Sequence, residues 1–496
     1  MSEPSVRLLV EDDLERSRLT VGLRFLLVIP HVIWIGLWSI AALFAAFANW
    51  VGTLLLGTPP ALLHRFLAAY VKYATQFYAY LRLAANPYPS FDGPDGYPID
   101  VAIAPPGRQR RLTVLARALL ALPAIVLAGA LGGNTIPQLA QRTGSGYLQV
   151  GLGGTVAVLG WFVCVARRRM PRGLRDAAAW SLLYSAQVWS YLLILTDRYP
   201  DLDPQALPGL PERTEPVGVR AEDDLRRSRL TTLFRLPLSF PHLFWLTLWT
   251  IVTILLAALN WLLTLIRGEP PAALHRFLAR FVRYELSVYA FLHLVANPFP
   301  GFAGAAGAYP AFEAEVPAPA RQNRWKVLFR LPLAIPAYVL SGIFSTLALI
   351  LAFFGWFAAL LLGRMPLGLR NAGAVALRYQ AQLLGYGLVL TDAYPYTGPV
   401  RADGPSASQV ATPGAIQGPA EPDGPAEPGG LAEPVAPPGG EPVGLAEPGG
   451  PAEPVARPGR EPAGLADPAG RQPNPPDRAG STGRDESSPF ELPPGA

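Results

Sequence analysis

The apolar residues divide the chain into four similar stretches, each a long apolar run followed by an amphipathic segment. The first stretch covers residues 21–89, and no charged side chain occurs between Phe25 and Leu56. A run of this length exceeds the roughly twenty residues that one helical crossing of a bilayer needs. The pattern therefore predicts membrane-embedded helices.

Prolines mark the repeat. Each amphipathic segment begins after one proline and ends before another that follows twenty-nine residues later; the pairs are Pro60 and Pro89, Pro171 and Pro200, Pro271 and Pro300, and Pro366 and Pro395. Such regularity indicates duplication of one unit. Motifs shared by the first and third copies, and others shared by the second and fourth, indicate that a two-copy ancestor doubled. We expect one membrane unit in residues 1–210 and a second in residues 211–397.

Arginines flank every apolar run on both sides, which by the positive-inside rule places both flanks in the cytoplasm. A single crossing cannot do this, so either the run folds back as a helical hairpin or the amphipathic helix makes the return crossing. The polar insert of the second copy, Gly132 to Gln149, would suit a hairpin tip. Ser39 lies at the equivalent point of the first copy. We therefore expect hairpins with Ser39 and the insert outside the cell and both termini in the cytoplasm.

The resulting fold class is an all-α polytopic membrane protein with about eight membrane-embedded helices. It has a four-fold internal repeat of an apolar segment plus an amphipathic helix. Two short alternating stretches, Tyr97 to Ile103 and Tyr309 to Val316, are compatible with brief strands.

The amphipathic helices of the first and third copies carry basic residues on their apolar faces, among them Arg82. This pattern is typical of helices at the membrane interface, whereas the uncharged helix of the second copy could equally span. Each basic residue near an anionic leaflet contributes about 1 kcal/mol. The candidate contacts to anionic lipid are Arg65, Lys72, Arg276, Arg280 and Arg283.

Three positions of the amphipathic helix form a polar stripe, because spacings of three and seven residues place them on one helical face. The stripe residues are Tyr73, Gln76 and Tyr80 in the first copy, Tyr184, Gln187 and Tyr191 in the second, and Tyr379, Gln382 and Tyr386 in the fourth. They could bind a polar ligand, but hydrogen bonds between helices are the more common use of such residues.

Composition supports a membrane location, since 51% of residues are hydrophobic and only 16% are charged. Residues 398–496 differ sharply, being rich in Pro, Gly, Ala and Glu, and predict a disordered tail. Residues 401–496 contain 14 acidic residues and 6 arginines. The acidic tail could engage a protein partner or the basic membrane face, or be solubilising filler.

Motifs for chemistry are missing from the sequence: it has no phosphate-binding Gly loop, no metalloprotease His pair, no nucleophile elbow and no nucleotide fingerprint. We therefore expect no enzyme activity, no cofactor and no nucleic-acid partner. His31 with His64, and the equivalent pair in the third copy, could form a metal or proton site, although such histidines are more often structural. Asn49 and Asn260 lie deep in the apolar runs and are expected to bond across helices.

Acidic runs precede the first and third apolar runs. Three adjacent acids from Glu11, or from Glu222, suggest a metal site, but acids four residues ahead of arginines are an ordinary helix-start and ion-pair arrangement.

The order of these motifs resembles a known family. An arginine, Ile-Pro-His, an apolar run, Gly-x-x-Pro and a helix ending at Tyr-Pro follow one another; the residues are Arg24, Ile29 to His31, Gly57 to Pro60 and Asn86 to Pro89. The fourth copy repeats the order from Arg330 to Pro395, with Ala337 in place of the histidine. The arrangement is similar to the bacterial membrane-protein family catalogued as domain of unknown function 4389, over residues 5–397. The resemblance implies an integral membrane location and supplies no catalytic residues.

Two functions fit these observations. The first is a non-enzymatic scaffold or accessory protein of the cell envelope, whose basic cytoplasmic surface holds anionic lipid. The alternative is a transporter of lipids or small amphiphiles that uses the pseudo-symmetric bundle as a cavity. A cavity with convergent polar groups would favour the second.

Overall fold

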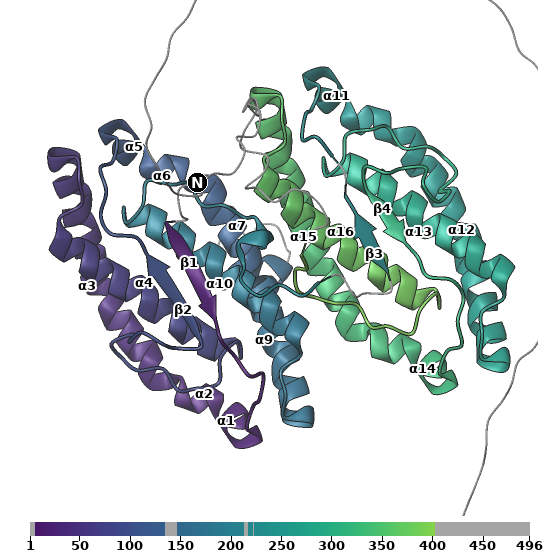
Figure 1. Ribbon diagram of the computed structural model, residues 1–496, viewed down its shortest axis with the longest axis horizontal. Coiled ribbons are helices and arrows are strands. Elements are labelled where there is room, and N and C mark those ends of the chain that lie inside the picture. Colours follow the sequence, from purple (N-terminus) through teal and green to yellow (C-terminus); the bar gives the residue numbers. More distant parts are fainter. Residues whose placement is uncertain (1–4, 134–145, 213–216, 222, 402–496) are drawn as a thin grey trace, which may run out of the picture. The chain divides into compact units, whose positions relative to one another are not determined.

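The computed structural model describes residues 5–133, 146–212, 217–221 and 223–401. These residues belong to one compact unit. Most of the polar insert, Glu222 and the tail from residue 402 lie outside the described residues. Each copy contributes a short strand, one or two short lead-in helices, a first helix and a 21-residue second helix (Figure 1); the first helix is long in three copies and interrupted in the second.

The first pair of copies comprises β1 (Val6–Val10), α1 (Arg18–Gly22), α2 (Arg24–Leu27), α3 (Ile29–Leu56), α4 (Ala61–Leu81), β2 (Ile99–Ile103), α5 (Arg111–Leu115), α6 (Arg117–Leu120), α7 (Leu122–Gly132), α9 (Gly146–Arg167), α10 (Arg172–Leu192) and the 3-10 turn η1 (Pro204–Ala206). The second pair comprises β3 (Gly218–Arg220), α11 (Arg229–Leu233), α12 (Arg235–Arg267), α13 (Ala272–Leu292), β4 (Glu313–Glu315), α14 (Arg324–Leu328), α15 (Arg330–Leu362) and α16 (Leu367–Gly387).

The first helices do not fold back as hairpins. Three of them, Arg24–Leu56, Arg235–Arg267 and Arg330–Leu362, are 33 residues long and apolar enough to cross a membrane. Ser39, expected at a hairpin tip, lies inside α3, where its hydroxyl bonds to the Ile35 carbonyl at 2.6 Å. The expectation was wrong because an apolar run without a Pro-Gly break keeps its helical hydrogen bonds. Within the described residues, three helices are long and apolar enough to cross a membrane, and the expected count of about eight membrane-embedded helices stays a prediction.

The second copy interrupts its first helix instead of turning at a tip. Helix α7 stops at Gly132, and the insert follows. Gly151 then adopts φ +58°, where a Cβ atom would lie 2.4 Å from the Gly133 nitrogen. The chain after the insert therefore resumes where α7 stopped. This copy has a broken helix at the level where α3, α12 and α15 are continuous.

The second helices form an inner layer between the first helices and the strands. Helix α4 contacts α3, α10 and β2, and α13 contacts α12, α16 and β4. The strand segments cover only part of the basic faces, at Lys72 and Arg283, and the interfacial position of α4 and α13 stays a prediction. Both helices begin directly after a proline, whose fixed φ suits a helix start and whose missing N–H is not needed there.

Two small antiparallel sheets join the copies within each pair. Strand β1 pairs with β2, with Val6 opposite Ile103, and β3 pairs with β4, with Gly218 opposite Glu315. The alternating stretches correctly predicted β2 and β4. Strand β1 was missed because its short alternation lies in a segment that is polar as a whole.

One hydrophobic core crosses the sequence boundary near residue 210. Helix α15 of the fourth copy packs against α7 and α9 of the second. Small residues such as Ala124 and Ala337, both fully buried, allow this close approach. Cys164 is also buried in this core, 3.7 Å from the Met170 sulfur.

The segment after the fourth copy binds back to the first pair of copies. The Tyr396 hydroxyl donates to Asp176 Oδ2 at 2.8 Å, and the Arg401 amide donates to the Pro211 carbonyl at 3.0 Å. Burial raises the pKa of Asp176, although the Arg175 guanidinium beside it opposes this shift. Tyr396 of the C-terminal segment thus adds to Arg175 in favouring the ionised form of Asp176.

This contact sets where the chain can be shortened. A chain ending after Arg401 should purify in detergent with unchanged thermal stability, because residues 402–496 lack an apolar face. A chain ending after Pro395 should be destabilised by about 1–3 kcal/mol, since a buried polar group then loses its partner. Thermal unfolding of both chains beside the full-length protein is the measurement. Equal stability of the two shortened chains would show that the Tyr396 contact contributes nothing.

Candidate functional site

An arginine near the start of each first helix, six residues before Pro30, Pro123, Pro241 or Pro336, binds the end of that copy's second helix. The four residues, Arg24, Arg117, Arg235 and Arg330, are at most 2% exposed. Each guanidinium carbon lies 4.1–4.5 Å from the centroid of an aromatic ring in the second helix. Each also donates to two backbone carbonyls beyond or at that helix end. These arginines are structural caps of the last carbonyls.

The ends of α10 and α16 receive additional caps, from asparagine and histidine side chains of the neighbouring copy and from a glutamine in the lead-in segment of the same copy. In the first pair the bonds are Asn49 to the Leu193 carbonyl at 2.9 Å, Gln109 to Ile194 at 2.9 Å and His64 to Leu195 at 3.3 Å. In the second pair Asn260 bonds to Leu388 at 3.0 Å and Gln322 to Val389 at 2.8 Å. Asn49 and Asn260 bond across helices as expected.

The predicted polar stripe is buried, except that Gln187 is half-buried. Tyr73 shares a 2.6 Å hydrogen bond with His31 on α3, and Tyr379 donates to the Ala337 carbonyl of α15 at 3.3 Å. The three glutamines instead bind loop or strand-segment backbone: Gln76 binds Pro94, Gln187 binds Asp201, and Gln382 binds Tyr396 and Val217. Tyr80, Tyr191 and Tyr386 lie beneath the capping arginines. Since His31 bonds to Tyr73 and His64 to Leu195, the two histidines serve separate contacts.

The five candidate lipid contacts divide into two groups. Arg65, Arg276 and Arg280 are exposed. Lys72 forms ion pairs with Asp95 and with Asp100, the latter at 3.3 Å, and the hydrogen bond from Lys72 lowers the pKa of Asp95. Arg283 donates to the Ala314 carbonyl at 3.2 Å. Lys72 and Arg283 thus hold the strand segments, while binding of lipid by the exposed three stays a prediction.

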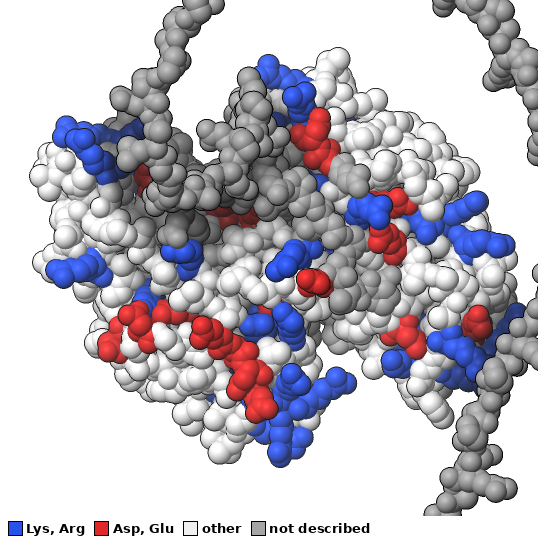
Figure 2. Space-filling view, in the orientation of Figure 1, with Lys and Arg blue, Asp and Glu red and all other residues white. Residues whose placement is uncertain are grey.

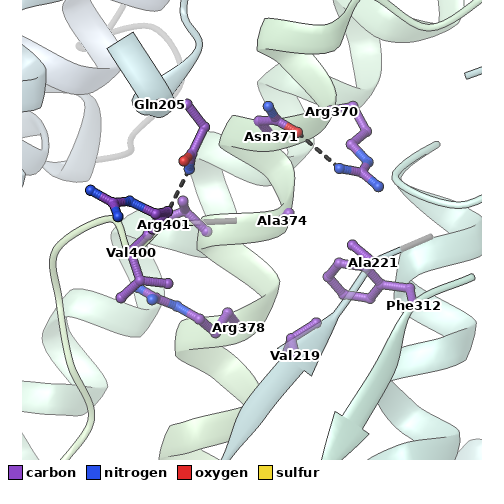
Figure 3. A pocket seen from close by; sticks show the side chains of 11 residues that line it. Gln205, Val219, Ala221, Phe312, Arg370, Asn371, Ala374, Arg378, Val400 and Arg401 are labelled. Atoms are coloured by element: carbon purple, nitrogen blue, oxygen red, sulfur yellow. Dashed lines mark hydrogen bonds between the residues drawn. The ribbon is translucent and has the colours of Figure 1, made fainter. Parts of the chain in front are cut away.

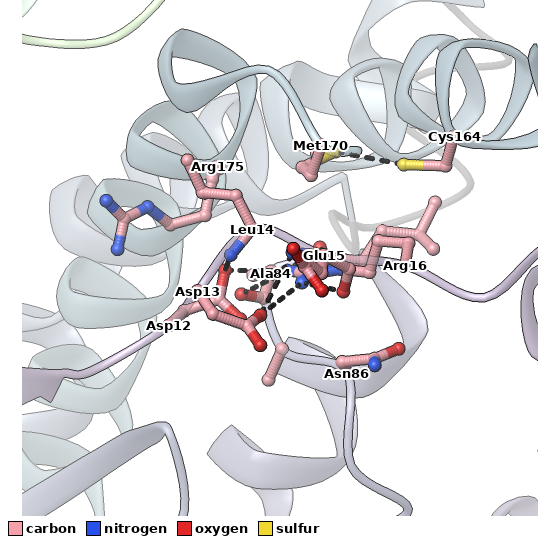
Figure 4. Close-up of polar contacts among 12 residues, drawn as sticks. Asp12, Asp13, Leu14, Glu15, Arg16, Ala84, Asn86, Cys164, Met170 and Arg175 are labelled. Atoms are coloured by element: carbon pink, nitrogen blue, oxygen red, sulfur yellow. Dashed lines mark hydrogen bonds and ion pairs between the residues drawn. The ribbon is translucent and has the colours of Figure 1, made fainter. Parts of the chain in front are cut away.

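The acidic run before the first copy forms an ion pair outside any helix. Arg16 is 2% exposed, and its Nη2 lies 2.7 Å from Asp12 Oδ2 (Figure 4). The same guanidinium donates to the carbonyls of Leu83 and Ala84. The pair therefore fixes the lead-in segment to the end of α4. Asp223 and Arg227 repeat it in the third copy at 2.5 Å.

A cavity of about 300 Å³ lies between the first two copies. This is the lower end of the roughly 300–1,000 Å³ that ligand pockets occupy. Its walls are contributed by α3, α4, α7 and α10. Equivalent positions of the two copies face it, among them Ala74 with Ser185, Tyr78 with Trp189, Gly36 with Gly129, and Ser39 with Gly132.

Most of this lining is apolar, and its exposed members mark the mouth. Val32 and Trp189 are each 53% exposed, and Gly36 is exposed as well. Ser39 and Tyr70 share a 2.8 Å hydrogen bond within the wall. Because Val32 and Gly36 belong to the apolar first helix, the mouth opens where an aliphatic chain could enter.

Arg82 is the charged residue of the cavity. Its side chain follows the end of α4 and is 6% exposed. Nη1 lies 3.0 Å from the Ser181 hydroxyl oxygen, and Nη2 donates to the Gly132 carbonyl at 2.8 Å. Among the described residues no carboxylate pairs with it. A buried cation without a counter-ion is costly, which is why buried charges in proteins are normally paired.

The broken helix of the second copy makes room for this arginine. The Gly132 carbonyl belongs to the last turn of α7, where the helix dipole favours a cation. A Cβ atom on Gly153 would lie 3.0 Å from Arg82 Nη1. Glycine at this position and the interruption of the helix thus let the guanidinium reach the cavity.

From the sequence alone, Arg82 was predicted only to be one of the interfacial basic residues. Its equivalents in the other copies are Leu193, His293 and Leu388, so a shared role is not readable from the repeat. The glycines in and just after the insert, from Gly132 to Gly153, were the available signal, because no other copy has a long insert in its sequence.

A second pocket, of about 70 Å³, lies beside the first half of α16 (Figure 3). Arg370 Nη1 donates to Asn371 Oδ1 at 2.9 Å, and Asn371 donates to Asp203 at 2.9 Å. Gln205 donates to the Val400 carbonyl at 2.9 Å. These bonds join the segments that follow the second and fourth copies, so we assign this pocket a structural role.

The comparison with family models agrees with the repeat. The model of a domain of unknown function (DUF4389) matches residues 18–92, 229–303 and 324–397. The second copy, with its interrupted helix, lies between the first two matches. No curated protein and no solved structure matches the chain. The chain therefore contains tandem copies of the domain of unknown function DUF4389.

Proposed function

We propose that this protein binds an anionic amphiphile in the cavity between its first two copies, with the anionic group on Arg82 and the aliphatic chain along the apolar walls. This proposal corresponds to the alternative function, a transporter of lipids or small amphiphiles, acting in the cell membrane. The observation that carries it is the buried guanidinium at a cavity, held by a hydroxyl and a carbonyl and, in the part of the chain that the structure describes, by no carboxylate.

The chemistry of the ligand follows from the site. A guanidinium has several N–H donors in a planar fork that matches a carboxylate or phosphate. Two of its nitrogens already bond to Ser181 and Gly132, so their remaining hydrogens are available to a ligand. A fatty acid and an anionic phospholipid both present the required anion.

Replacing Arg82 with glutamine should weaken the binding of anionic lipid about ten- to a hundredfold, because a charge-assisted hydrogen bond is worth about 1.5–3 kcal/mol. The measurement is native mass spectrometry of the full chain in detergent, with oleate and phosphatidylglycerol added separately. The oleate arm reports carboxylate binding, and the phosphatidylglycerol arm reports phosphate binding. Arg82→Lys should retain part of the binding.

Arg110→Gln is the control, since Arg110 is exposed, lies outside the cavity and is not among the candidate lipid contacts. It should leave both arms unchanged. Ala74→Leu fills the cavity without altering the charge and should also reduce binding. This variant tests the proposal if the Arg82 variant does not fold. Unchanged lipid in both folded variants would overturn the proposal.

The scaffold function rests on a different observation, the exposure of Arg65, Arg276 and Arg280. These residues suit a basic surface that holds anionic headgroups without a pocket. Loss of lipid in an Arg276→Gln, Arg280→Gln variant, with no loss in Arg82→Gln, would favour this second function.

A further inference from the structure

The first helices expose a continuous apolar surface. Only 17% of the 18-residue apolar stretch within Arg24–Leu56 and within α12 is buried, and 28% of that within α15. On α2 and α3, Leu26, Leu37, Phe44 and Leu55 are 59–71% exposed. Their spacings of eleven, seven and eleven residues place them along one line of the helix. An apolar surface of this extent needs a partner.

The opposite side of the molecule is polar along the length of the helices. The segment that contains strand β1 is attached at both ends. Before the strand, Ser5 bonds to Thr196, beyond the end of α10; after it, Arg16 bonds to Leu83, beyond the end of α4. Since α4 ends where α10 begins, as the bond of Met170 to Leu14 shows, the strand runs beside the helices. Figure 2 shows basic and acidic side chains spread over this strand-bearing side.

Several of these charges lie beside the middle of the helices, not beyond their ends. Tyr73 bonds to His31 and Tyr70 to Ser39, so this part of α4 lies beside the first half of α3. The ion pair of Lys72 and Asp100 is therefore at the same level. On the other pair of copies, Arg220 and Glu315 form a half-exposed ion pair at 2.8 Å.

Both ends of the long helices are basic. Arg18 donates to the Ala166 carbonyl at the start of the first copy's helices, and Arg111 donates to the Leu55 carbonyl at the end of α3. Arg229 donates to the Leu361 carbonyl in the second pair, and the Arg324 guanidinium lies beside Gly268, where α12 ends. The two ends are thus both basic, whereas the basic residues around a helix that crosses the membrane gather mainly at its cytoplasmic end.

We propose that the protein lies in one leaflet, with its first helices parallel to the membrane plane and their exposed apolar surface in the acyl layer. Crossing would place the strands and their charges in hydrocarbon, where open sheet edges do not occur and each charge costs about 2.5–3.5 kcal/mol. A 33-residue helix is also about 50 Å long, against a hydrocarbon thickness of about 30 Å. Lying flat leaves both basic ends and the strands in the headgroup layer and water.

This arrangement also resolves the sequence puzzle of arginines on both flanks. Both flanks reach one side of the membrane without a hairpin, because the helix between them never crosses. The inference rests on the surface of the molecule and is independent of the cavity and its ligand.

Spin labels on the apolar line of α3 would test it. Single cysteines replace Leu26, Leu37, Phe44 or Leu55 in the full chain carrying Cys164→Ala, reconstituted in vesicles of phosphatidylcholine and phosphatidylglycerol. Collision with oxygen and with a water-soluble nickel chelate reports the depth of each label. Ala102→Cys, exposed on β2, is the control and should contact water.

Helices in the plane should give four labels at similar depth. A crossing helix should place Leu37 and Phe44 deeper than Leu26 and Leu55 by about 15 Å, and this result would overturn the proposal. Water-exposed α3 labels would overturn it as well, because the surface would then face no lipid. Oriented circular dichroism of the unmodified protein in stacked bilayers gives the helix direction without any substitution; axes along the bilayer normal would contradict the proposal.

Discussion

An alanine in place of Arg117 should lower the free energy of unfolding by about 3 kcal/mol or more. Arg117 donates to the carbonyls of Tyr191 at 3.0 Å and Thr196 at 2.5 Å, and to Gln109 at 2.8 Å. Removing it leaves buried carbonyls without donors, each costing about 1–3 kcal/mol. Thermal unfolding of the full chain in detergent measures the loss.

Two further variants separate the effect of the cap from the effect of charge. Arg117→Lys keeps the charge but loses the planar fork, so it should recover only part of the stability. Arg110→Ala removes an exposed arginine of the same segment and should change stability by less than about 0.5 kcal/mol. A loss of similar size in the Arg110 variant would show that total charge, and not the cap, determines stability.

The second large effect is expected at Gly304, which lies in the segment after α13. Its φ is +57°, and a Cβ atom there would lie 2.1 Å from the Arg280 carbonyl oxygen and 2.9 Å from Tyr284 Cβ. Gly304→Ala should therefore push the segment away from α13 and cost about 2 kcal/mol beyond the conformational penalty of alanine at positive φ. Unfolding and limited proteolysis of residues 300–312 report the change.

Gly307→Ala separates the two causes. Gly307 has φ +75°, but no atom lies within 4 Å of its Cβ position. Alanine at Gly307 has the same conformational penalty without the clash. If both variants unfold at the same temperature, the close approach of the segment to α13 has no energetic weight.

The repeat and its helices could be predicted from the sequence because prolines recur at equivalent positions in every copy. Pro60 and its equivalents begin the second helices, and Gly57 ends α3 with φ +78°, so composition and backbone geometry agree there. The left-handed residues after the second helices could not be read. Leu83, Ile194 and Val389 adopt φ of 59–61°, which side chains of this kind rarely do. Tertiary contacts hold them, since all three are at most 2% exposed.

The hairpin expectation failed for a related reason. Charge on both flanks of a run constrains which side the flanks occupy, but not the path between them. The continuity of α3 depends on local hydrogen bonds, and its orientation depends on surfaces formed by strands far away in the sequence. Arg82 escaped notice because its importance arises only when Gly132 and Ser181 meet it, 50 and 99 residues later.

The caps that one copy provides to the next make the order of synthesis matter. Asn49 leaves the ribosome 144 residues before Leu193, the residue whose carbonyl it binds. At roughly 5–20 residues per second, this separation corresponds to on the order of ten seconds. During that interval the first copy holds an unpaired amide in an apolar helix. We therefore expect the first copy to complete its polar contacts only after α10 of the second copy has been made.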